Sequence, residues 1–371
     1  MALTLLTLLP KQVAKDPVVN RSRWFMTAGL TLIGLQFLIL FIGDFRFTNV
    51  MMDVIINISF FIPCSAIMSL AVLNLQRQGK LNPIEELVWV PSWLLAITML
   101  ITAAMMQDQP FDNKSTSIII AEIGASAIYG LMQLYYILLQ IKELKRMREV
   151  LDNYYDSRRE DLLTWMKMNV ILLALMAIFV PIVIFTTRGV LMGFGALLFT
   201  GLFYQWFCFC RYVISGEVKT VSDAEEEEAV EEKNEEQELN VKTKLSKETM
   251  QRVEKAVTDW INHNGHLRQG ITSPDAAKKM KLPRYQLSSW IKESGYSSFS
   301  NWITTLRVNH AKQLLAAHRD WSNETIAEQC GMSLSHFQKV FHEQTGMTPA
   351  QYVYELTLHK EKTSPLNNLT T

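Results

Sequence analysis

The chain has 371 residues, enough for two or more domains; 49% of them are hydrophobic and the formal net charge is zero. Its four cysteines form no Cys-x-x-Cys pair and three lie in apolar runs, which makes a disulfide framework or a zinc site a poor interpretation. The zero charge conceals three unlike regions, with net +3 over residues 1–216, −9 over 217–240 and +6 over 241–371. Such asymmetry indicates segments with different partners.

Six apolar runs are long enough to cross a bilayer, because about 20 apolar residues in a helix span about 30 Å of hydrocarbon. They cover residues 24–43, 50–73, 87–106, 116–141, 168–187 and 190–214. The opening stretch, MALTLLTLLP, lacks the basic leader of a signal peptide and ends in a proline. We therefore predict a bundle of six transmembrane helices over residues 1–216.

Lysine and arginine in the flanks predict the orientation of these spans, since they gather on the cytoplasmic side. Thirteen of them lie before the first run, after the second and after the fourth. The alternate loops hold only Arg46, Lys114 and Arg188. The amino terminus is therefore expected in the cytoplasm, and six crossings return the carboxyl-terminal region to the same side.

Two ionisable side chains, Asp53 and Glu122, lie inside the predicted spans, where charge is costly and often functional. Both are close to the predicted outer surface, so contact with interfacial water is the simpler explanation. The alternative is a shallow outward-facing pocket, with Asp44, Asp108 and Asp112 above it, that receives a cationic ligand or a partner protein. Asp53 and Glu122 are therefore candidate signal-sensing residues.

An acidic segment, SDAEEEEAVEEKNEEQELN, follows the last span at residues 222–240. Blocks of like charge are typically solvated tethers, and like charges four residues apart weaken a helix. We predict a linker over residues 217–246. A competing hypothesis is that the segment folds over the basic carboxyl-terminal region and competes there with phosphates.

A second domain is predicted over residues 247–356, ahead of a polar, disordered tail at 357–371. Residues 247–262 have apolar side chains at helical spacing. The chain then repeats itself at an offset of 50 residues. The matched positions are Ala276-Ala277 with Ile326-Ala327, Leu282 with Met332, Leu287 with Phe337, Ile291 with Phe341, Glu293 with Glu343, Trp302 with Tyr352 and Leu306 with Leu356.

Each copy reads as helix, tight turn, helix. In the second copy Asn323 and Ser333 are expected to cap the two helices, and Gly331 supplies the turn between them. In the first copy Pro274 and Pro283 are expected to open the helices, and Lys281 stands where the second copy has Gly331.

The second helix of each copy presents hydrogen-bonding side chains on the face opposite its apolar residues. Such a helix suits the major groove, where base edges display distinct donors and acceptors, and the net +6 supplies attraction to phosphates. A solvated amphipathic helix is the alternative, which the doubled arrangement disfavours. The predicted DNA-binding residues are Arg284, Tyr285, Ser288, Ser289 and Lys292 in the first copy, and Ser335, His336, Gln338, Lys339 and His342 in the second.

The string IAEQCGMSLSHFQKVFHEQTGMTPAQY (326–352) resembles the double helix-turn-helix domain of the AraC/XylS transcription regulators, and LRVNHAKQLL (306–315) is similar to that family's connecting helix. The resemblance covers residues 247–356, about a third of the chain. It implies two helix-turn-helix units in successive major grooves on one face of the duplex. It also implies phosphate contacts around FHEQTGMTPAQY. The apolar front end is similar to that of membrane-anchored members in bacteria.

The leading hypothesis is an all-α protein of the bacterial inner membrane that binds promoter DNA through a cytoplasmic domain. The runner-up is a membrane sensor whose helical tail binds a protein partner. A transporter or membrane enzyme is the third, but few polar residues converge in the spans and the sequence has no Gly-rich phosphate loop, kinase motif or nucleophile–histidine constellation. We therefore expect a non-enzyme without metal or cofactor, whose partners are double-stranded DNA and the lipid bilayer. Homodimer formation, contact with RNA polymerase and an unknown ligand stay open.

Overall fold

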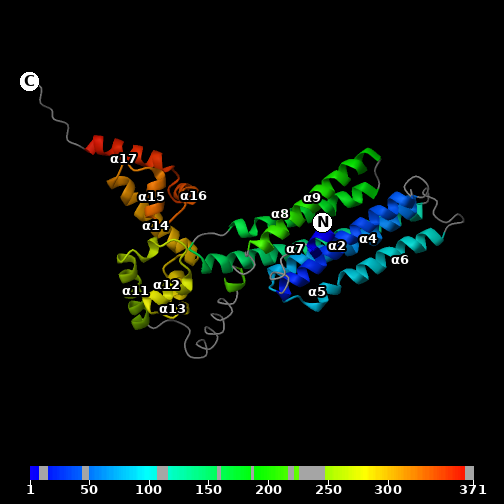
Figure 1. Ribbon diagram of the computed structural model, residues 1–371, viewed down its shortest axis with the longest axis horizontal. Helices are drawn as coiled ribbons and strands as arrows, with labels where there is room; N and C mark the ends of the chain where they lie inside the picture. Colours follow the sequence, from blue (N-terminus) through cyan, green and yellow to red (C-terminus); the bar gives the residue numbers. More distant parts are fainter. Residues whose placement is uncertain are drawn as a thin grey trace, which may run out of the picture. The chain divides into compact units, whose positions relative to one another are not determined.

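The computed structural model describes residues 1–7, 16–43, 50–106, 116–156, 160–184, 188–215, 221–224 and 247–363. Within these ranges the chain forms helices and no named strand, which confirms the predicted all-α class. The helices belong to two compact units (Figure 1). Unit 1 comprises residues 1–148 and 160–222, and unit 2 comprises residues 149–159 and 223–371.

Unit 1 carries the predicted spans, and in its described part six helices are long and apolar enough to cross a membrane. The helices of the region that contains unit 1 are α1 (Ala2–Thr7), α2 (Pro17–Gly43), α4 (Val50–Gln76), α5 (Pro83–Leu87), α6 (Trp89–Met105), α7 (Thr116–Tyr154), α8 (Glu160–Ile184) and α9 (Arg188–Ile214). Helix α7 has 39 residues. At 1.5 Å per residue it is about 58 Å long, roughly twice the hydrocarbon thickness. Its last residues belong to unit 2.

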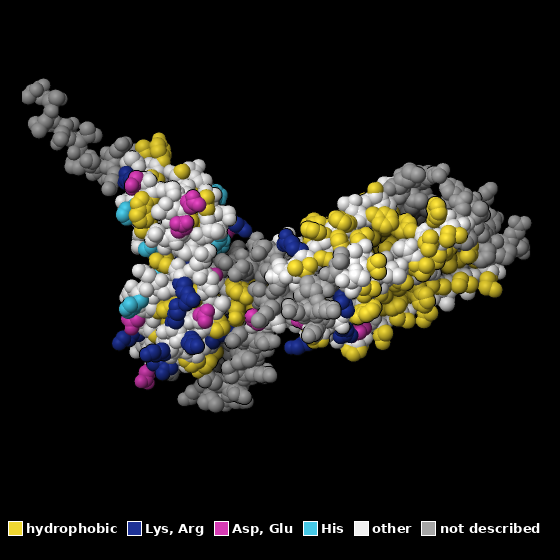
Figure 2. Space-filling view, viewed as in Figure 1, with side chains coloured by type: hydrophobic (Ala, Val, Ile, Leu, Met, Phe, Trp, Pro, Cys, Tyr) yellow, Lys and Arg dark blue, Asp and Glu magenta, His cyan; other side chains and the backbone are white. Residues whose placement is uncertain are grey.

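Large hydrophobic side chains lie on the outside of unit 1. Phe41 is 85% exposed, Ile42 74% and Leu131 69%, and many more are exposed along the six long helices. In the described part of unit 2 only Leu334, Tyr354 and Leu358 are large, hydrophobic and exposed. Figure 2 shows the contrast, with hydrophobic side chains over much of unit 1 and charged and polar ones over unit 2. Such a surface is unfavourable in water and suits contact with lipid.

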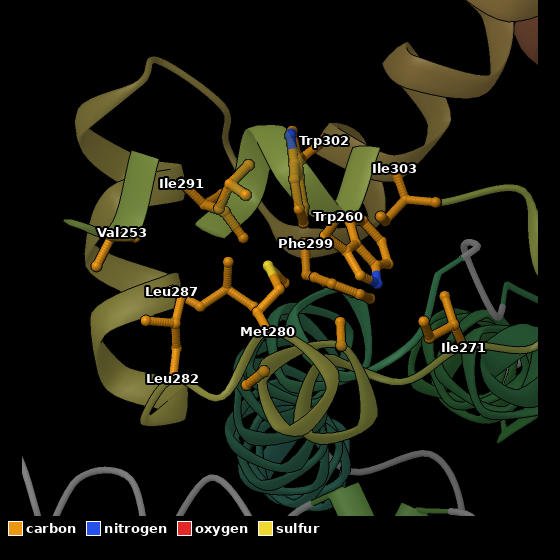
Figure 3. Close-up of a cluster of buried hydrophobic side chains, with 13 residues drawn as sticks. Val253, Trp260, Ile271, Met280, Leu282, Leu287, Ile291, Phe299, Trp302 and Ile303 are labelled. Atoms are coloured by element: carbon orange, nitrogen blue, oxygen red, sulfur yellow. The ribbon is translucent and has the colours of Figure 1, made fainter. Parts of the chain in front are cut away.

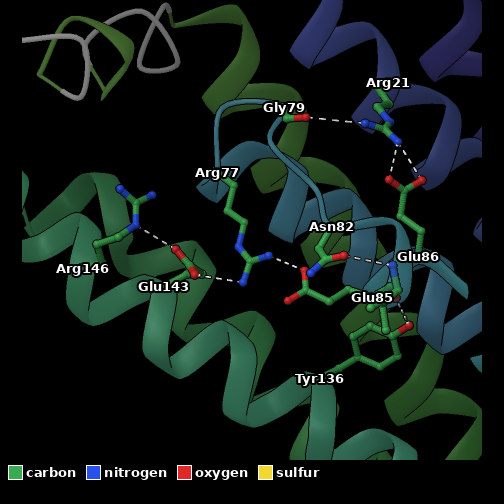
Figure 4. A network of polar contacts seen from close by, with 10 residues as sticks. Arg21, Arg77, Gly79, Asn82, Glu85, Glu86, Tyr136, Glu143 and Arg146 are labelled. Atoms are coloured by element: carbon green, nitrogen blue, oxygen red, sulfur yellow. Dashed lines mark hydrogen bonds and ion pairs between the residues drawn. The ribbon is translucent and has the colours of Figure 1, made fainter. Parts of the chain in front are cut away.

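A network of charged side chains joins α2, α7 and the connection between α4 and α6 in unit 1 (Figure 4). Arg77, at the end of α4, pairs with Glu85 on α5 and with Glu143 on α7, the latter at 3.0 Å. Arg146 joins Glu143 at 2.8 Å. Arg21 on α2 binds Glu86 through two contacts of 2.6 and 2.7 Å. These contacts fix α7 against the connection between α4 and α6, at the end where the basic flanks predict cytoplasm.

Unit 2 contains seven α-helices and one 3₁₀ turn in its described carboxyl-terminal part. They are α11 (Lys247–Asn262), η2 (Gly265–Leu267), α12 (Ser273–Met280), α13 (Arg284–Glu293), α14 (Phe299–Ala317), α15 (Asn323–Gln329), α16 (Leu334–Thr345) and α17 (Pro349–Thr363). The pair α12–α13 is the first helix-turn-helix and the pair α15–α16 the second, joined by α14.

Two hydrophobic cores hold these pairs, and α14 contributes to both. Phe299, Trp302 and Ile303 lie in the first core (Figure 3). Val308, Ala311 and Leu315 lie in the second. The ring of Trp302 contacts those of Trp260, Trp290 and Phe299, with centroids 5.7, 5.7 and 5.8 Å away. Its repeat equivalent Tyr352 packs on Phe341 with ring centroids 5.4 Å apart.

The tight turns of the two copies have the same backbone conformation. Lys281 has φ 56° and Gly331 has φ 67°, both left-handed. The first turn is therefore as regular as the second, although a lysine occupies the glycine position. One predicted cap shifts by one residue: Ser322, rather than Asn323, caps α15, whereas Ser333 caps α16 as expected. In the first copy Thr272 caps α12.

One predicted boundary differs from the structure, and most of the predicted linker lies outside the described residues. Helix α17 continues to Thr363, so residues 357–363 are helical and the predicted start of a disordered tail at 357 is wrong. Of the acidic linker 217–246, only residues 221–224 are described, and they are helical. The hypotheses about residues 225–246 therefore stay predictions.

The two turn positions should respond differently to the same change. A Cβ atom at Gly331 would lie 2.0 Å from the carbonyl oxygen of Leu267, a backbone atom. We expect Gly331→Ala to destabilise unit 2 by more than the roughly 1–2 kcal/mol of left-handed strain alone. Lys281→Ala is the matched control, because position 281 already holds a side chain, and we expect a change within about 0.5 kcal/mol. Urea unfolding of the full chain with pulse proteolysis of unit 2 measures both; equal effects would contradict the turn assignment.

Candidate nucleic-acid interface

The second helix of each pair buries one face and turns the other outward. In α13 Leu287 and Ile291 are buried, and in α16 Phe337 and Phe341 are buried, at equivalent positions of the repeat. This agrees with the inward faces expected from the hydrophobic spacing. The candidate interface therefore consists of the opposite faces of α13 and α16.

The outward face of α16 carries Ser335, Gln338, Lys339 and His342, all exposed. A hydroxyl, an amide, an ammonium and an imidazole follow one another along about two helical turns. These groups can donate to the O6 and N7 acceptors of guanine or pair with the N6 and N7 edge of adenine. The face therefore has the chemistry to read base edges directly.

The side chains on the outward face of α13 are less exposed than those of α16. Lys292 is exposed, whereas Tyr285, Ser288 and Ser289 are half-buried. The hydroxyl of Tyr285 accepts a hydrogen bond of 2.8 Å from the Gln286 side chain, so it is positioned by its neighbour. The two serines and Lys292 are the repeat equivalents of Gln338, Lys339 and His342.

Two predicted contact residues face other parts of unit 2. Arg284 donates to Ser273 at 3.3 Å, and its guanidinium lies 5.9 Å from the ring centroid of Tyr154. His336 is half-buried and lines a pocket with Ser300 and Thr304 of α14. Burial lowers the pKa of His336, which favours a neutral ring at pH 7. Both side chains are less exposed than those of Gln338 and Lys339.

A group of lysines beside α13 was not among the predicted contact residues. Lys278 and Lys279 occupy the last turn of α12 and Lys281 the tight turn, and all three are exposed. Lysines at such a position suit backbone phosphates, which position a protein on DNA without reading its sequence. The signal was present as the stretch KKMK at 278–281.

A buried arginine lies between the two cores. Arg307 on α14 is 2% exposed and donates to the backbone carbonyls of His266 and Arg268 at 2.8 and 2.7 Å. Its carboxylate partner is Asp156, at 2.8 Å and also 2% exposed. Removing one partner of such a buried pair costs about 3–5 kcal/mol, because the other charge stays behind unpaired. Asp156 is 151 residues away in sequence, so no local pattern predicted this contact.

The candidate sensing residues belong to unit 1. Asp53 lies in the first turn of α4 and is 4% exposed. Glu122 is half-buried in the second turn of α7. Asp44, Asp108 and Asp112, which the hypothesis placed above them, lie outside the described residues. A sensing role for Asp53 and Glu122 stays a prediction.

The comparisons with known proteins concern unit 2. Residues 276–358 match the model of the family described as "Helix-turn-helix domain". The regulatory protein PocR of Salmonella typhimurium is 33% identical over 90 residues, 24% of this chain and 29% of that protein. The uncharacterised transcriptional regulatory protein YesN of Bacillus subtilis is 35% identical over 81 residues, 21% of this chain and 22% of that protein. The chain thus matches less than a third of the length of either relative. No solved structure matches the chain.

Low pH should lower the stability of unit 2, because unfolding allows His266 to bind a proton. The residue is 5% exposed, and burial, together with nearby His310 and Arg307, lowers the pKa of its imidazole to about 4. The unfolded state, with a pKa of about 6.5, therefore binds more protons between these values, so stability is fully present above pH 6.5 and is lost as the pH falls toward 4. We expect urea unfolding of unit 2 to become easier from pH 7 to 5, and His266→Phe to reduce that dependence. His263→Phe, an exposed position at the end of α11, is the control; an unchanged slope in His266→Phe would contradict this expectation.

Proposed function

We propose that this chain, whose carboxyl-terminal residues form an AraC-type helix-turn-helix domain, is a membrane-anchored transcription regulator that binds specific DNA sequences. The observation that carries the proposal is the exposed set Ser335, Gln338, Lys339 and His342 on α16, held by a buried apolar face within a helix-turn-helix pair. The matched regulators support DNA binding as the role of this domain.

A doubled helix-turn-helix favours a long recognition site. Helices α13 and α16 belong to two pairs joined by the single helix α14, which packs in both cores. Two readers on one face of a duplex reach successive major grooves about 10–10.5 base pairs apart. We propose that α16 reads bases most deeply, and that α13 combines base contacts from Ser288, Ser289 and Lys292 with phosphate contacts from Lys278, Lys279 and Lys281.

Anchoring in the bacterial inner membrane is supported by unit 1. Its six long helices have exposed hydrophobic side chains where lipid would be. The polar network around Arg77 and Glu143 lies at the end of the bundle flanked by most of the lysines and arginines. Both termini are proposed to lie in the cytoplasm.

The bond between Asp156 and Arg307 supports this topology independently of the lysine and arginine counts. Asp156 and Arg307 bond within unit 2, and this bond requires the segment that follows α7 and the carboxyl-terminal helices to share one side of the membrane. Two long apolar helices, α8 and α9, separate them in sequence. Two crossings return the chain to the side it left, which agrees with the bond.

The proposed regulator is not an enzyme, and the runner-up is that unit 2 binds a protein instead of DNA. The runner-up needs an apolar docking face, and in the described part of unit 2 Leu334, Tyr354 and Leu358 are the only exposed large hydrophobic residues. The outward faces of α13 and α16 are instead polar, which favours a nucleic acid.

The DNA proposal predicts the effect of a change on α16. The full chain in lipid nanodiscs should enrich one family of sequences from a pool of random duplexes. Gln338→Ala with Lys339→Ala should weaken binding to the selected duplex about 10- to 100-fold, since a good base contact discriminates by about 1–3 kcal/mol. Selection followed by titration of duplex against nanodisc, at stated salt, measures both.

The control removes the same residue types from another helix. Lys312→Ala with Gln313→Ala takes a lysine and a glutamine from α14, outside both recognition helices, and should leave sequence preference unchanged. Enrichment of no sequence by the wild-type chain would overturn the DNA proposal. Equal losses in the two double variants would overturn the role given to α16.

The topology has a separate test. Alkaline phosphatase, which is active only outside the cytoplasm, should be active when inserted between residues 107 and 115 and inactive when fused after residue 371. A green fluorescent protein at the latter position should fluoresce. Phosphatase activity at the carboxyl terminus would contradict the cytoplasmic placement of unit 2.

A further inference from the structure

The DNA-binding unit is discontinuous in sequence. Besides the carboxyl-terminal helices, it contains residues 149–159, which include the last turn of α7 and the residues just after it. This segment connects the fourth and fifth candidate membrane helices. A loop between membrane helices thus supplies part of the domain that carries the candidate DNA interface.

Three adjacent residues of this segment contact the carboxyl-terminal part of unit 2. Asp156 accepts hydrogen bonds through one oxygen, Oδ2, from the backbone N–H groups of Gly270 and Ile271 at 2.8 and 3.2 Å, and from Arg307 at 2.8 Å. Tyr155 forms an antiparallel bridge with Thr272, the residue that caps α12. The ring of Tyr154 lies under the guanidinium of Arg284, the first residue of α13.

These contacts converge on the joint between the two helix-turn-helix pairs. Arg307 lies on α14 between the residues that enter the first core and those that enter the second. It also binds the carbonyls of His266 and Arg268, in the loop that precedes α12. The carbonyl between these two, from Leu267, abuts the turn glycine Gly331 of the second pair. Asp156 therefore binds an arginine on α14 and a loop that leads into the first helix-turn-helix pair and abuts the turn of the second.

A carboxylate is required at this joint. Arg307 is buried and carries a positive charge, and two carbonyl oxygens do not neutralise it. Asp156 supplies the negative charge and satisfies two backbone N–H groups of the loop at the same time. Without the charge of Asp156, Arg307 keeps its two carbonyl acceptors but loses its counter-ion, while each hydrophobic core keeps its own contacts.

The segment is also tied to the membrane bundle through its own helix. Helix α7 runs without interruption from Thr116 to Tyr154. About three helical turns before Tyr154, the last residue of α7, Glu143 pairs with Arg77 and Arg146 inside unit 1. A shift or rotation of α7 moves Tyr154, Tyr155 and Asp156 with it, because helices transmit displacement as rigid elements.

We propose that residues 154–156 are a docking element through which α7 sets the relative placement of the two DNA-reading helices, with Asp156 as the positioning residue. This inference rests on the proposed function and adds its regulation. In the docked state α13 and α16 are held at one separation and read two grooves at a fixed spacing. When these contacts are broken, the two helix-turn-helix pairs can move relative to each other. They then bind DNA more weakly and no longer require that spacing.

The first arm of the test asks whether the element docks, independently of DNA. Tyr155→Cys with Thr272→Cys places two thiols on residues that face each other in a bridge, where opposed Cβ atoms lie about 4.5–5.5 Å apart. Mild oxidation of the full chain in nanodiscs should give a disulfide between positions 155 and 272, identified by mass spectrometry. Each single variant is the control. Failure of the pair to link, with unit 2 folded, overturns the docking.

The second arm asks whether docking controls DNA reading. Asp156→Asn keeps the shape and the ability to accept N–H bonds but removes the charge. On duplexes selected by the wild-type chain, it should weaken binding about 5- to 150-fold, the usual range for coupled sites. It should also tolerate about two base pairs inserted between the half-sites, which the wild-type chain rejects. Asp259→Asn, an exposed carboxylate on α11, should behave as wild type.

Rescue separates control of DNA reading from simple damage to the fold. In the Asp156→Asn background, the oxidised link between positions 155 and 272 should restore both affinity and spacing preference, and reduction should remove them again. The inference is overturned if the disulfide-linked Asp156→Asn chain still binds weakly and shows no preference for half-site spacing. It is also overturned if the Asp156→Asn chain matches wild type in both affinity and spacing preference. A wild-type chain that prefers no duplex overturns the proposed function itself, while the disulfide arm still decides whether the element docks.

Discussion

A guanidinium removed from water must have a carboxylate beside it, and in unit 2 this requirement joins distant parts of the chain. Arg307 lies where the two helix-turn-helix cores meet, and Asp156 reaches it from the end of a candidate membrane helix. The same carboxylate binds the loop before α12 through the N–H groups of Gly270 and Ile271, so one pair joins that loop, α14 and the segment after α7. The cost of leaving one partner alone, about 3–5 kcal/mol, is comparable with much of a domain's stability.

Different interactions stabilise the interior of each unit. Unit 2 buries aromatic and aliphatic side chains, with Trp302 among three other rings, as a soluble domain does. In unit 1 lipid would be as apolar as the helix surfaces, so close packing and polar contacts between helices carry more of the specificity. The contacts of Arg77 with Glu85 and Glu143, and of Arg21 with Glu86, fit that need.

Periodic features were predictable from the sequence. Apolar runs predicted the six long helices, and the 50-residue repeat predicted the equivalence of Leu287 with Phe337 and of Trp302 with Tyr352. Single long-range contacts were not, because they leave no local pattern: neither the Asp156–Arg307 pair nor the stacking of Arg284 on Tyr154 could be seen. The orientation of His336 toward α14 also required the packing of two helices, and Lys281 adopts a backbone conformation that its residue type disfavours.

The discontinuity of unit 2 has a consequence for how the molecule is made. Asp156 leaves the ribosome before α8 and α9, whereas Arg307 follows long after them. Unit 2 therefore cannot be completed until the hairpin of α8 and α9 has been synthesised and the chain has returned to the side where Asp156 lies. In the proposed topology, a nascent chain that inserted only one of the two helices would leave Asp156 and Arg307 on opposite sides of the bilayer. Correct insertion would thereby be a precondition for a complete unit 2.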